Sequence, residues 1–162
     1  MSQGLDAEGV RRGLREFPGV EHRIEFVREK DGVAWINDSK GTNPDSTIKA
    51  VQAMTRPTIL LLGVGNYDKK SDFAPLFEAF DGKVKAVIAS GLNVPAIKLA
   101  AEKTGYSPVY VNDGPMIDML KQAEGAGPKR GRGAAFPCGG KLGIYDNYEQ
   151  RGEIFKELVN KL

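Results

Sequence analysis

Thr58–Leu62, with the sequence TILLL, is a short and almost continuously apolar run. A strand that is buried on both faces of a parallel sheet has this composition. Val84–Ala89 has the same character, and Phe73–Phe80 between the two runs has apolar residues at helical spacing. The pattern therefore predicts a parallel strand–helix–strand unit in the middle of the chain.

The alternation of strands and helices continues toward the C-terminus. Val109–Val111 is a further strand candidate, and helical periodicity predicts helices over Val94–Lys103, Met116–Ala123 and Tyr148–Leu162. Strands that alternate with helices form parallel sheets covered on both faces, so we expect an α/β fold with a mostly parallel sheet. Ligands bind such sheets at the carboxyl ends of the strands.

The N-terminal part predicts a strand pair of another kind. Arg23–Val27 and Val33–Asn37 have strand character and are separated by Asp31-Gly32, a dipeptide typical of hairpin turns. We therefore expect an N-terminal hairpin-like strand pair. Helices are predicted before and after it, over Gly4–Phe17 and Ser46–Met54.

One segment interrupts the alternation. Seven glycines fall between Gly125 and Gly143, and Ala134–Phe136 is only weakly apolar. Glycine weakens strands, so the sequence predicts no buried strand there.

Composition excludes several classes of protein. The 162 residues fit about one domain, and a net charge of +2 is far from the basic surplus of a dedicated nucleic-acid binder. The single cysteine, Cys138, and the single histidine, His22, exclude an internal disulfide and any metal motif that needs two histidines or several thiolates. Because the sequence shows neither an apolar run long enough to span a membrane nor a secretory signal, we expect a cytoplasmic protein.

Two polar loops follow predicted strands. In Asp38–Pro44, Lys40 could meet a phosphate, and Thr42 with the next helix N-terminus could add donors, although plain helix capping explains the loop equally well. In Gly63–Ser71, Lys69 or Lys70 could hold a carboxylate or phosphate. The G-x-x-x-x-G-K-[ST] spacing of a phosphate loop is absent, and a solvated turn is the simpler interpretation. His22 and Trp35 are most simply structural, the tryptophan as core.

His22-Arg23, followed by Trp35–Asn43 (WINDSKGTN), closely resembles the C-terminal domain of the D-glutamate-adding Mur ligases. Tyr67–Phe73 and Asn147–Gly152 are similar to later motifs of that family, in the same order. The resemblance extends from about Gly4 to Leu162. It implies a Rossmann-like sheet flanked by helices, the third of three domains.

The resemblance implies an ATP-driven ligase that adds D-glutamate to UDP-N-acetylmuramoyl-L-alanine in peptidoglycan biosynthesis. Residues 1–19 would be the tail end of the central ATPase domain, which carries the phosphate loop and the Mg²⁺ ligands, and residues 20–162 the domain that binds D-glutamate and closes over ATP. Because the chain contains no phosphate loop, we expect it to be inactive alone. The alternative is a non-catalytic module that binds a nucleotide or an acidic amino acid.

The resemblance also implies site residues. Four residues would contact the nucleotide: Arg23, Asp38, Lys40 and Thr42. Asp38 suits a ribose hydroxyl, and Arg23 and Lys40 suit the adenosine and phosphate side. D-glutamate would meet Thr42, Lys69, Tyr148 and Lys141, the last in place of a serine that the family carries.

Residues 131–142 depart from the family, which has a buried strand and a serine loop there, of the form D-V-V-L-L-S-P-A-x-x-S. Codons can be chosen for residues 131–143 that, read one base later, spell D-V-V-L-L-S-P-A-A-E-S-W and return a serine to position 141. We therefore predict two compensating single-base shifts around this segment. A domain with the present sequence is expected to be only marginally stable, because several apolar side chains of a central strand are lost.

Overall fold

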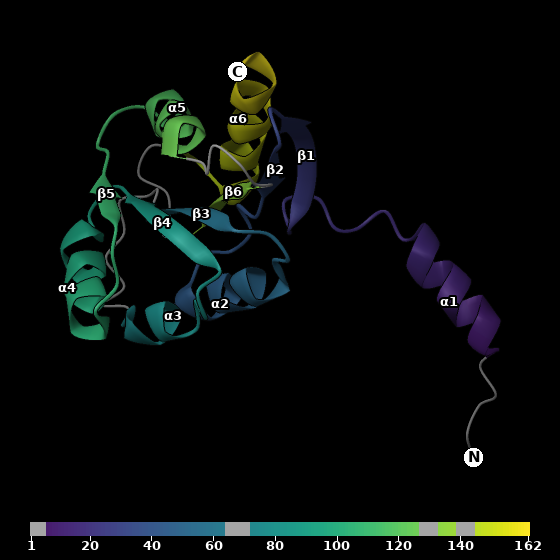
Figure 1. Cartoon of the computed structure of the whole chain (residues 1–162). Helices are drawn as coiled ribbons and strands as arrows, with labels where there is room; N and C mark the ends of the chain where they lie inside the picture. Colours follow the sequence, from purple (N-terminus) through teal and green to yellow (C-terminus); the bar gives the residue numbers. More distant parts are fainter. Residues whose placement is uncertain (1–5, 64–71, 127–132, 139–144) are drawn as a thin grey trace.

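The computed structural model describes residues 6–63, 72–126, 133–138 and 145–162, with the backbone alone for Leu14 and residues 133–138. Their strands form a six-stranded sheet in the order β1-β2-β6-β3-β4-β5 (Figure 1). The strands are β1 (Glu25–Lys30), β2 (Val33–Asn37), β3 (Thr58–Leu62), β4 (Val84–Ala89), β5 (Val109–Val111) and β6 (Gly133–Cys138). β1 is antiparallel to β2, and every other pairing is parallel. The predicted mostly parallel α/β sheet with an N-terminal hairpin is thus confirmed.

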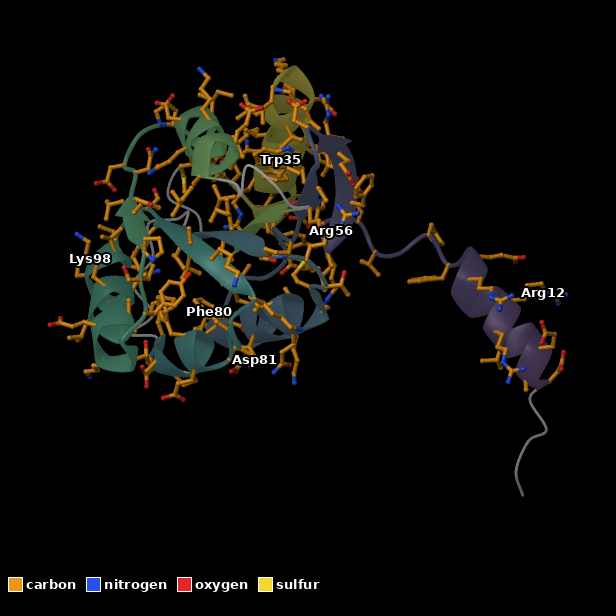
Figure 2. The ribbon with its side chains drawn as sticks, in the orientation of Figure 1. Arg12, Trp35, Arg56, Phe80, Asp81 and Lys98 are labelled. Carbon is orange, nitrogen blue, oxygen red and sulfur yellow. The ribbon has the colours of Figure 1, made fainter. Side chains whose placement is uncertain are left out.

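Helices cover both faces of the sheet. The helices are α1 (Ala7–Glu16), α2 (Pro44–Ala53), α3 (Ala74–Glu78), α4 (Val94–Thr104), α5 (Met116–Ala126) and α6 (Tyr148–Lys161). Leu60 and Leu62 pack with α2, α3 and α4, whereas Ile59 and Leu61 pack with α5 and α6. Successive residues of a strand point to opposite faces, so this one apolar run supplies both cores. Figure 2 places Phe80 in the first core and Trp35 in the second.

The prediction that no strand follows α5 was wrong. Gly133–Cys138 forms β6, which pairs with both β2 and β3 and so completes the middle of the sheet. Pro137 stands opposite Leu61 in this ladder, although proline has no N–H to donate and is rare in central strands. Pairing on both sides outweighs the poor strand propensity of this segment.

The helix α1 lies apart from the sheet, joined to β1 by an extended segment (Figure 1). Asp6 caps it by accepting hydrogen bonds from the N–H groups of Glu8 and Gly9. Its Val10 is 44% exposed. No helix in the described part of the chain is both long and apolar enough to cross a membrane.

Candidate functional site

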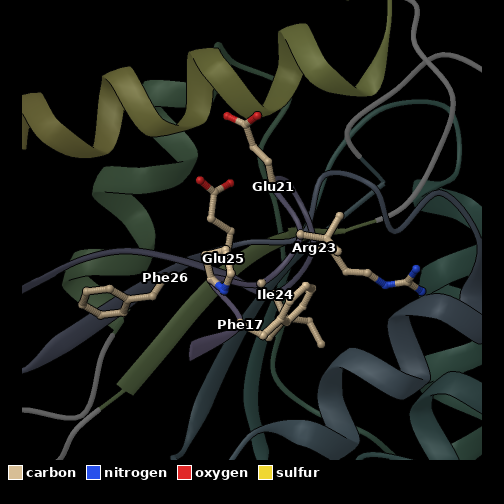
Figure 3. Close-up of a pocket in the computed structure, with 9 residues that line it drawn as sticks. Phe17, Glu21, Arg23, Ile24, Glu25 and Phe26 are labelled. Carbon is tan, nitrogen blue, oxygen red and sulfur yellow. The ribbon is translucent and has the colours of Figure 1, made fainter. Parts of the chain in front are cut away.

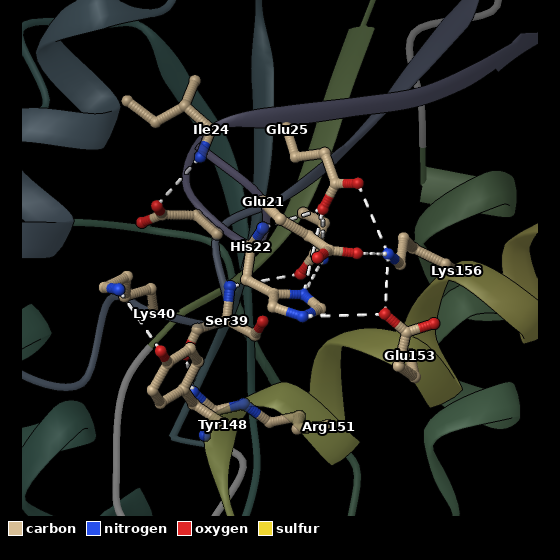
Figure 4. Close-up of polar contacts among 12 residues, drawn as sticks. Glu21, His22, Ile24, Glu25, Ser39, Lys40, Tyr148, Arg151, Glu153 and Lys156 are labelled. Carbon is tan, nitrogen blue, oxygen red and sulfur yellow. Dashed lines mark hydrogen bonds and ion pairs between the residues drawn. The ribbon is translucent and has the colours of Figure 1, made fainter. Parts of the chain in front are cut away.

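One edge of the sheet gathers most of the predicted site. Parallel strands bring their carboxyl ends to the same edge, and β2 ends there at Asn37. The loop Asp38–Asn43 follows and leads into α2, which Asn43 caps through a hydrogen bond from the Ser46 N–H. Because β1 is antiparallel to β2, its first residue, Glu25, lies at this edge too, opposite Asn37. Figure 4 shows the start of α6 beside them.

Lys40 and Tyr148 come together at this edge. The Nζ of Lys40 lies 3.2 Å from the Tyr148 hydroxyl and 5.1 Å from the centre of its ring. Lys40 is exposed and Tyr148 is half-buried. The ammonium group and the phenol therefore form one exposed polar pair between the loop after β2 and the N-terminus of α6.

Asp38 is nearly buried, with 3% of its surface exposed. Its Oδ1 accepts a hydrogen bond from the Ile24 N–H at 3.1 Å, and its carbonyl accepts one from Gly41 at 2.8 Å. A Cβ at Gly41 would lie 2.5 Å from Asp38 Oδ2, so this turn requires glycine. One carboxylate oxygen of Asp38 thus fixes the segment that carries Arg23, a role that sequence reasoning missed.

Arg23 is exposed and borders an open pocket of about 610 Å³ (Figure 3). Apolar side chains from the segment before β1 and from β1 itself form much of its wall, notably Phe17, Val20, Ile24 and Phe26. The pocket thus places apolar side chains next to a guanidinium group, with the carboxylates of Glu21 and Glu25 also in its wall. A guanidinium group pairs with phosphates and stacks on planar rings.

His22 is buried and structural, as expected for a lone histidine. Its Nδ1 lies 3.0 Å from the Asn37 side-chain nitrogen, and its carbonyl accepts a hydrogen bond from the Lys40 N–H at 3.0 Å. Its ring also meets the Tyr148 ring edge to face, with centroids 6.0 Å apart. His22 thus contacts both partners of the polar pair, Lys40 through its backbone and Tyr148 through its ring.

The helix α6 approaches this loop very closely at Gly152. A Cβ there would overlap His22 Nδ1 and would lie 2.5 Å from Ser39 Oγ. The neighbouring Arg151 is 1% exposed and donates a hydrogen bond to the Ser39 carbonyl. Arg151 and Gly152 are the last residues of the motif Asn147–Gly152, which marks them in the sequence. The spacing of this motif does not by itself predict their contact with the loop.

Glu21, His22 and Glu153 bring ligand atoms within 4.8 Å of one another, as a metal site would. The Lys156 ammonium already lies 2.7 Å from a carboxylate oxygen of both Glu21 and Glu153 (Figure 4). The hydrogen bond from Lys156 lowers the pKa of Glu21. Burial opposes the charge of Lys156, yet its hydrogen bonds with Glu153 and Glu21 leave its pKa above the ordinary value. Lysine is therefore the cation of this cluster.

The remaining predicted site residues are less defined. Thr42 is half-buried in the turn before α2. Lys69 and Lys141 lie outside the described residues.

The fold is that of several solved ligases and synthases. UDP-N-acetylmuramate-alanine ligase from Thermotoga maritima superposes with a TM-score of 0.62 at 16% identity, over 98% of this chain and 34% of that one. A bifunctional folylpolyglutamate synthase/dihydrofolate synthase from Yersinia pestis gives 0.61 at 16% identity, over 98% and 36%. At these identities the likeness concerns the fold alone.

The family model described as "Mur ligase, glutamate ligase domain" matches residues 22–126, and the chain belongs to this family. It is 41% identical over 160 residues to the UDP-N-acetylmuramoylalanine–D-glutamate ligase of Alkaliphilus metalliredigens, and 37% identical over 158 residues to that of Clostridioides difficile. Each match covers 98% of this chain and 34% of the relative. The chain thus spans about a third of the length of these relatives and matches their C-terminal part. The predicted resemblance is confirmed.

Proposed function

We propose that the chain is the C-terminal part of an ATP-dependent ligase that adds D-glutamate to UDP-N-acetylmuramoyl-L-alanine in cytoplasmic peptidoglycan biosynthesis. Residues 1–19 would belong to the end of a central ATPase domain, and residues 20–162 would form the domain that closes over the substrates. The names of the relatives that match 98% of the chain support this proposal.

The contact between Lys40 and Tyr148 is the structural observation that best supports the proposal. These residues are 108 positions apart in the sequence, yet their side chains meet at 3.2 Å at the carboxyl edge of the sheet. One was predicted to bind the nucleotide and the other D-glutamate. Their contact supports two adjoining subsites, as amide formation requires, because ATP must phosphorylate an oxygen of the acceptor carboxylate and the amine of D-glutamate must then attack the carbon of the same group, releasing phosphate.

The described residues fit the anionic part of ATP. Arg23 and Lys40 are both exposed cations at this edge, and phosphate oxygens pair with such groups. Thr42 adds a hydroxyl donor, and the Asp38 carboxylate would accept a hydrogen bond from a ribose hydroxyl. Bound ATP would supply the phosphoryl group that activates the acceptor carboxylate. A Mn and AMPPNP complex of a folylpolyglutamate synthase with this fold is consistent with that assignment.

Mg²⁺ has no comparable fit among the described residues, because Lys156 occupies the one cluster of suitable ligands. We assign its ligands to the part of the ligase outside this chain. D-glutamate would meet Tyr148 and Thr42, with Lys69 paired to one of its carboxylates. At position 141 the chain offers Lys141, a second cation, where a serine was expected.

A chimera tests the proposal. It joins the part of the Alkaliphilus metalliredigens relative that ends just before the position matching residue 20 to residues 20–162 of this chain. We expect phosphate release that depends on both UDP-N-acetylmuramoyl-L-alanine and D-glutamate, whereas L-glutamate should give none. The 162-residue chain alone should be inactive.

Matched lysine variants locate the activity in the chimera. Lys40→Ala should reduce turnover at least tenfold, since a charged contact to substrate is lost. Lys98→Ala removes an exposed lysine of α4 and should leave turnover unchanged. An inactive but folded chimera whose residues 20–162 still bind ATP would instead favour a non-catalytic binding module.

A further inference from the structure

Asn37, the last residue of β2, is fully buried at the carboxyl edge of the sheet, and its side-chain amide is fixed from two sides. Its Oδ1 accepts a hydrogen bond from the Ser39 N–H at 3.1 Å, and its Nδ2 donates one to Glu25 Oε2 at 3.0 Å. Only the amide oxygen can accept from an N–H, and only the amide nitrogen can donate to a carboxylate. The orientation of the Asn37 amide is therefore set by partners other than His22.

This orientation determines where the His22 ring carries its proton. Asn37 Nδ2 also lies 3.0 Å from His22 Nδ1. An amide nitrogen only donates, so Nδ1 must accept, and the proton of the neutral ring is on Nε2. Nε2 lies 3.6 Å from an acceptor, Glu153 Oε1. A proton on Nδ1 would set two donors against each other between side chains that are shielded from water, where an unsatisfied polar group is costly.

The charges that face the ring are already balanced without a positive charge on it. The ring is surrounded by three carboxylates, those of Glu21, Glu25 and Glu153. The Nζ of Lys156 lies within 3.4 Å of an oxygen of each of them (Figure 4). Lys40 adds a second cation, 3.2 Å from the hydroxyl of Tyr148, whose ring meets that of His22.

We propose that His22 is a positioning residue that holds the loop Asp38–Asn43 in place as a neutral imidazole protonated on Nε2. Its Nδ1 holds the Asn37 amide, which in turn accepts the Ser39 N–H. Its carbonyl accepts the Lys40 N–H at 3.0 Å. Without Nδ1, a buried donor of Asn37 has no partner, so the amide turns and releases the loop. The effect on nucleotide binding rests on the proposed function, because Lys40 is the group that the loop presents.

The protonation of the ring is measured directly. The chain contains one histidine, so the ring 15N resonances of the uniformly 15N-labelled 162-residue chain belong to His22 alone. At neutral pH we expect only the pattern of a protonated Nε2 and an unprotonated Nδ1. A proton on Nδ1, or a mixture of the two tautomers, would overturn the inference. This measurement uses no ligand, so its outcome is independent of the proposed function.

Two variants separate the acceptor from the backbone. His22→Asn and His22→Gly both suit the φ of 63° at this position. Asparagine Oδ1 is attached to Cγ, as histidine Nδ1 is, so only His22→Asn keeps an acceptor for the Asn37 amide. In a titration with Mg-ATP, His22→Gly should weaken binding about tenfold and His22→Asn no more than about threefold. The Ser39 amide resonance should move in His22→Gly and stay near its original position in His22→Asn.

A second background shows whether His22 acts through the loop. In Lys40→Ala, adding His22→Gly should change the affinity less than about twofold, because the group that the loop presents is gone. Equal affinities of the two His22 variants, or the same loss with and without Lys40, would overturn the positioning role and leave the nucleotide site intact. If the original chain does not bind Mg-ATP, the nucleotide site is wrong, whereas the ring spectrum and the Ser39 resonance still decide how His22 holds the loop. The urea midpoint of each variant identifies one that merely unfolds.

Discussion

The Lys40 ammonium and the Tyr148 hydroxyl lie 3.2 Å apart, so the loop after β2 and the N-terminus of α6 share one polar contact. Asn147 caps α6 at this point by accepting a hydrogen bond from the Gln150 N–H. The helix start is therefore fixed independently of the contact. We therefore expect Tyr148 to restrain Lys40, which is the more exposed partner, rather than the reverse.

Tyr148→Phe tests this restraint. The ring that packs against His22 remains, but the acceptor for the Lys40 ammonium is lost. A hydrogen bond with a charged group contributes roughly 1.5–3 kcal/mol, and less where it is as exposed as here. We expect nucleotide affinity to fall two- to tenfold with no change in the urea midpoint of unfolding. A shift of that midpoint comparable with a core substitution would show that Tyr148 acts mainly in folding.

Gly152 is predicted to be indispensable to the docking of α6. Gly152→Ala places a Cβ against His22 Nδ1 and Ser39 Oγ, and overpacking of this kind costs about 1–3 kcal/mol. Gly125→Ala is the matched control, because a Cβ at that position of α5 meets nothing within 4 Å. It should raise the free energy of unfolding by up to about 1 kcal/mol through helix propensity. Urea denaturation of both variants measures the difference, and equal effects would contradict the packing described at Gly152.

The ion pairs of Lys156 predict a loss of stability in acid. The pKa of Glu21 is lower in the folded chain than its ordinary value of 4.5, chiefly through the hydrogen bond from Lys156. A depressed carboxyl pKa stabilises the fold above the unfolded pKa, and this contribution is lost as the pH falls from about 4.5 through the folded pKa. Because Glu21 is exposed, solvent screening keeps the contribution small.

Lys156→Met should therefore flatten the dependence of the urea midpoint on pH below about 4.5. Glu21→Gln should flatten it less, because Lys156 also pairs with Glu25 and Glu153. Adding Glu21→Gln to Lys156→Met should change little more, because the pair between the two residues is already lost. Strictly additive effects would mean that the two side chains act separately.

Apolar patterns predict the fold well where burial alone selects the element. β3 and β4 occupy the predicted residues, since each is a largely buried run with sharp ends. β5 also lies where it was predicted, although Tyr110 and Val111 are exposed. β6 could not be found this way, because Gly133 and Pro137 oppose strand formation and only pairing with β2 and β3 imposes it. The bonds of His22, Asp38 and Arg151 were missed for a related reason: they join segments distant in sequence and leave no periodic signal.

Strand β6 allows a direct test of whether residues 131–142 are the native sequence or the product of two single-base shifts. β6 places Ala134 opposite both Ala34 and Thr58, and Ala135 opposite both Trp35 and Ile59. The reading shifted by one base would place two leucines at positions 134 and 135, preceded by two valines. β6 thus overlaps the apolar run of the shifted reading. The residues of β2 and β3 that pair with positions 134 and 135 are all buried.

Replacing residues 131–142 with D-V-V-L-L-S-P-A-A-E-S-W should raise the free energy of unfolding by several kcal/mol. Each buried valine or leucine contributes roughly 1.5–3 kcal/mol relative to exposure, and the loss of Gly133 from a strand removes a backbone entropy cost. Lys141→Ser alone is the control, since it restores the expected serine without touching β6 and should leave stability unchanged. Sequencing of the encoding DNA completes the test. Codons that permit the shifted reading, flanked by single-base slips, would agree with a more stable replacement. Codons that forbid this reading, or a replacement that is less stable than the original, would establish Gly133–Cys138 as the native central strand.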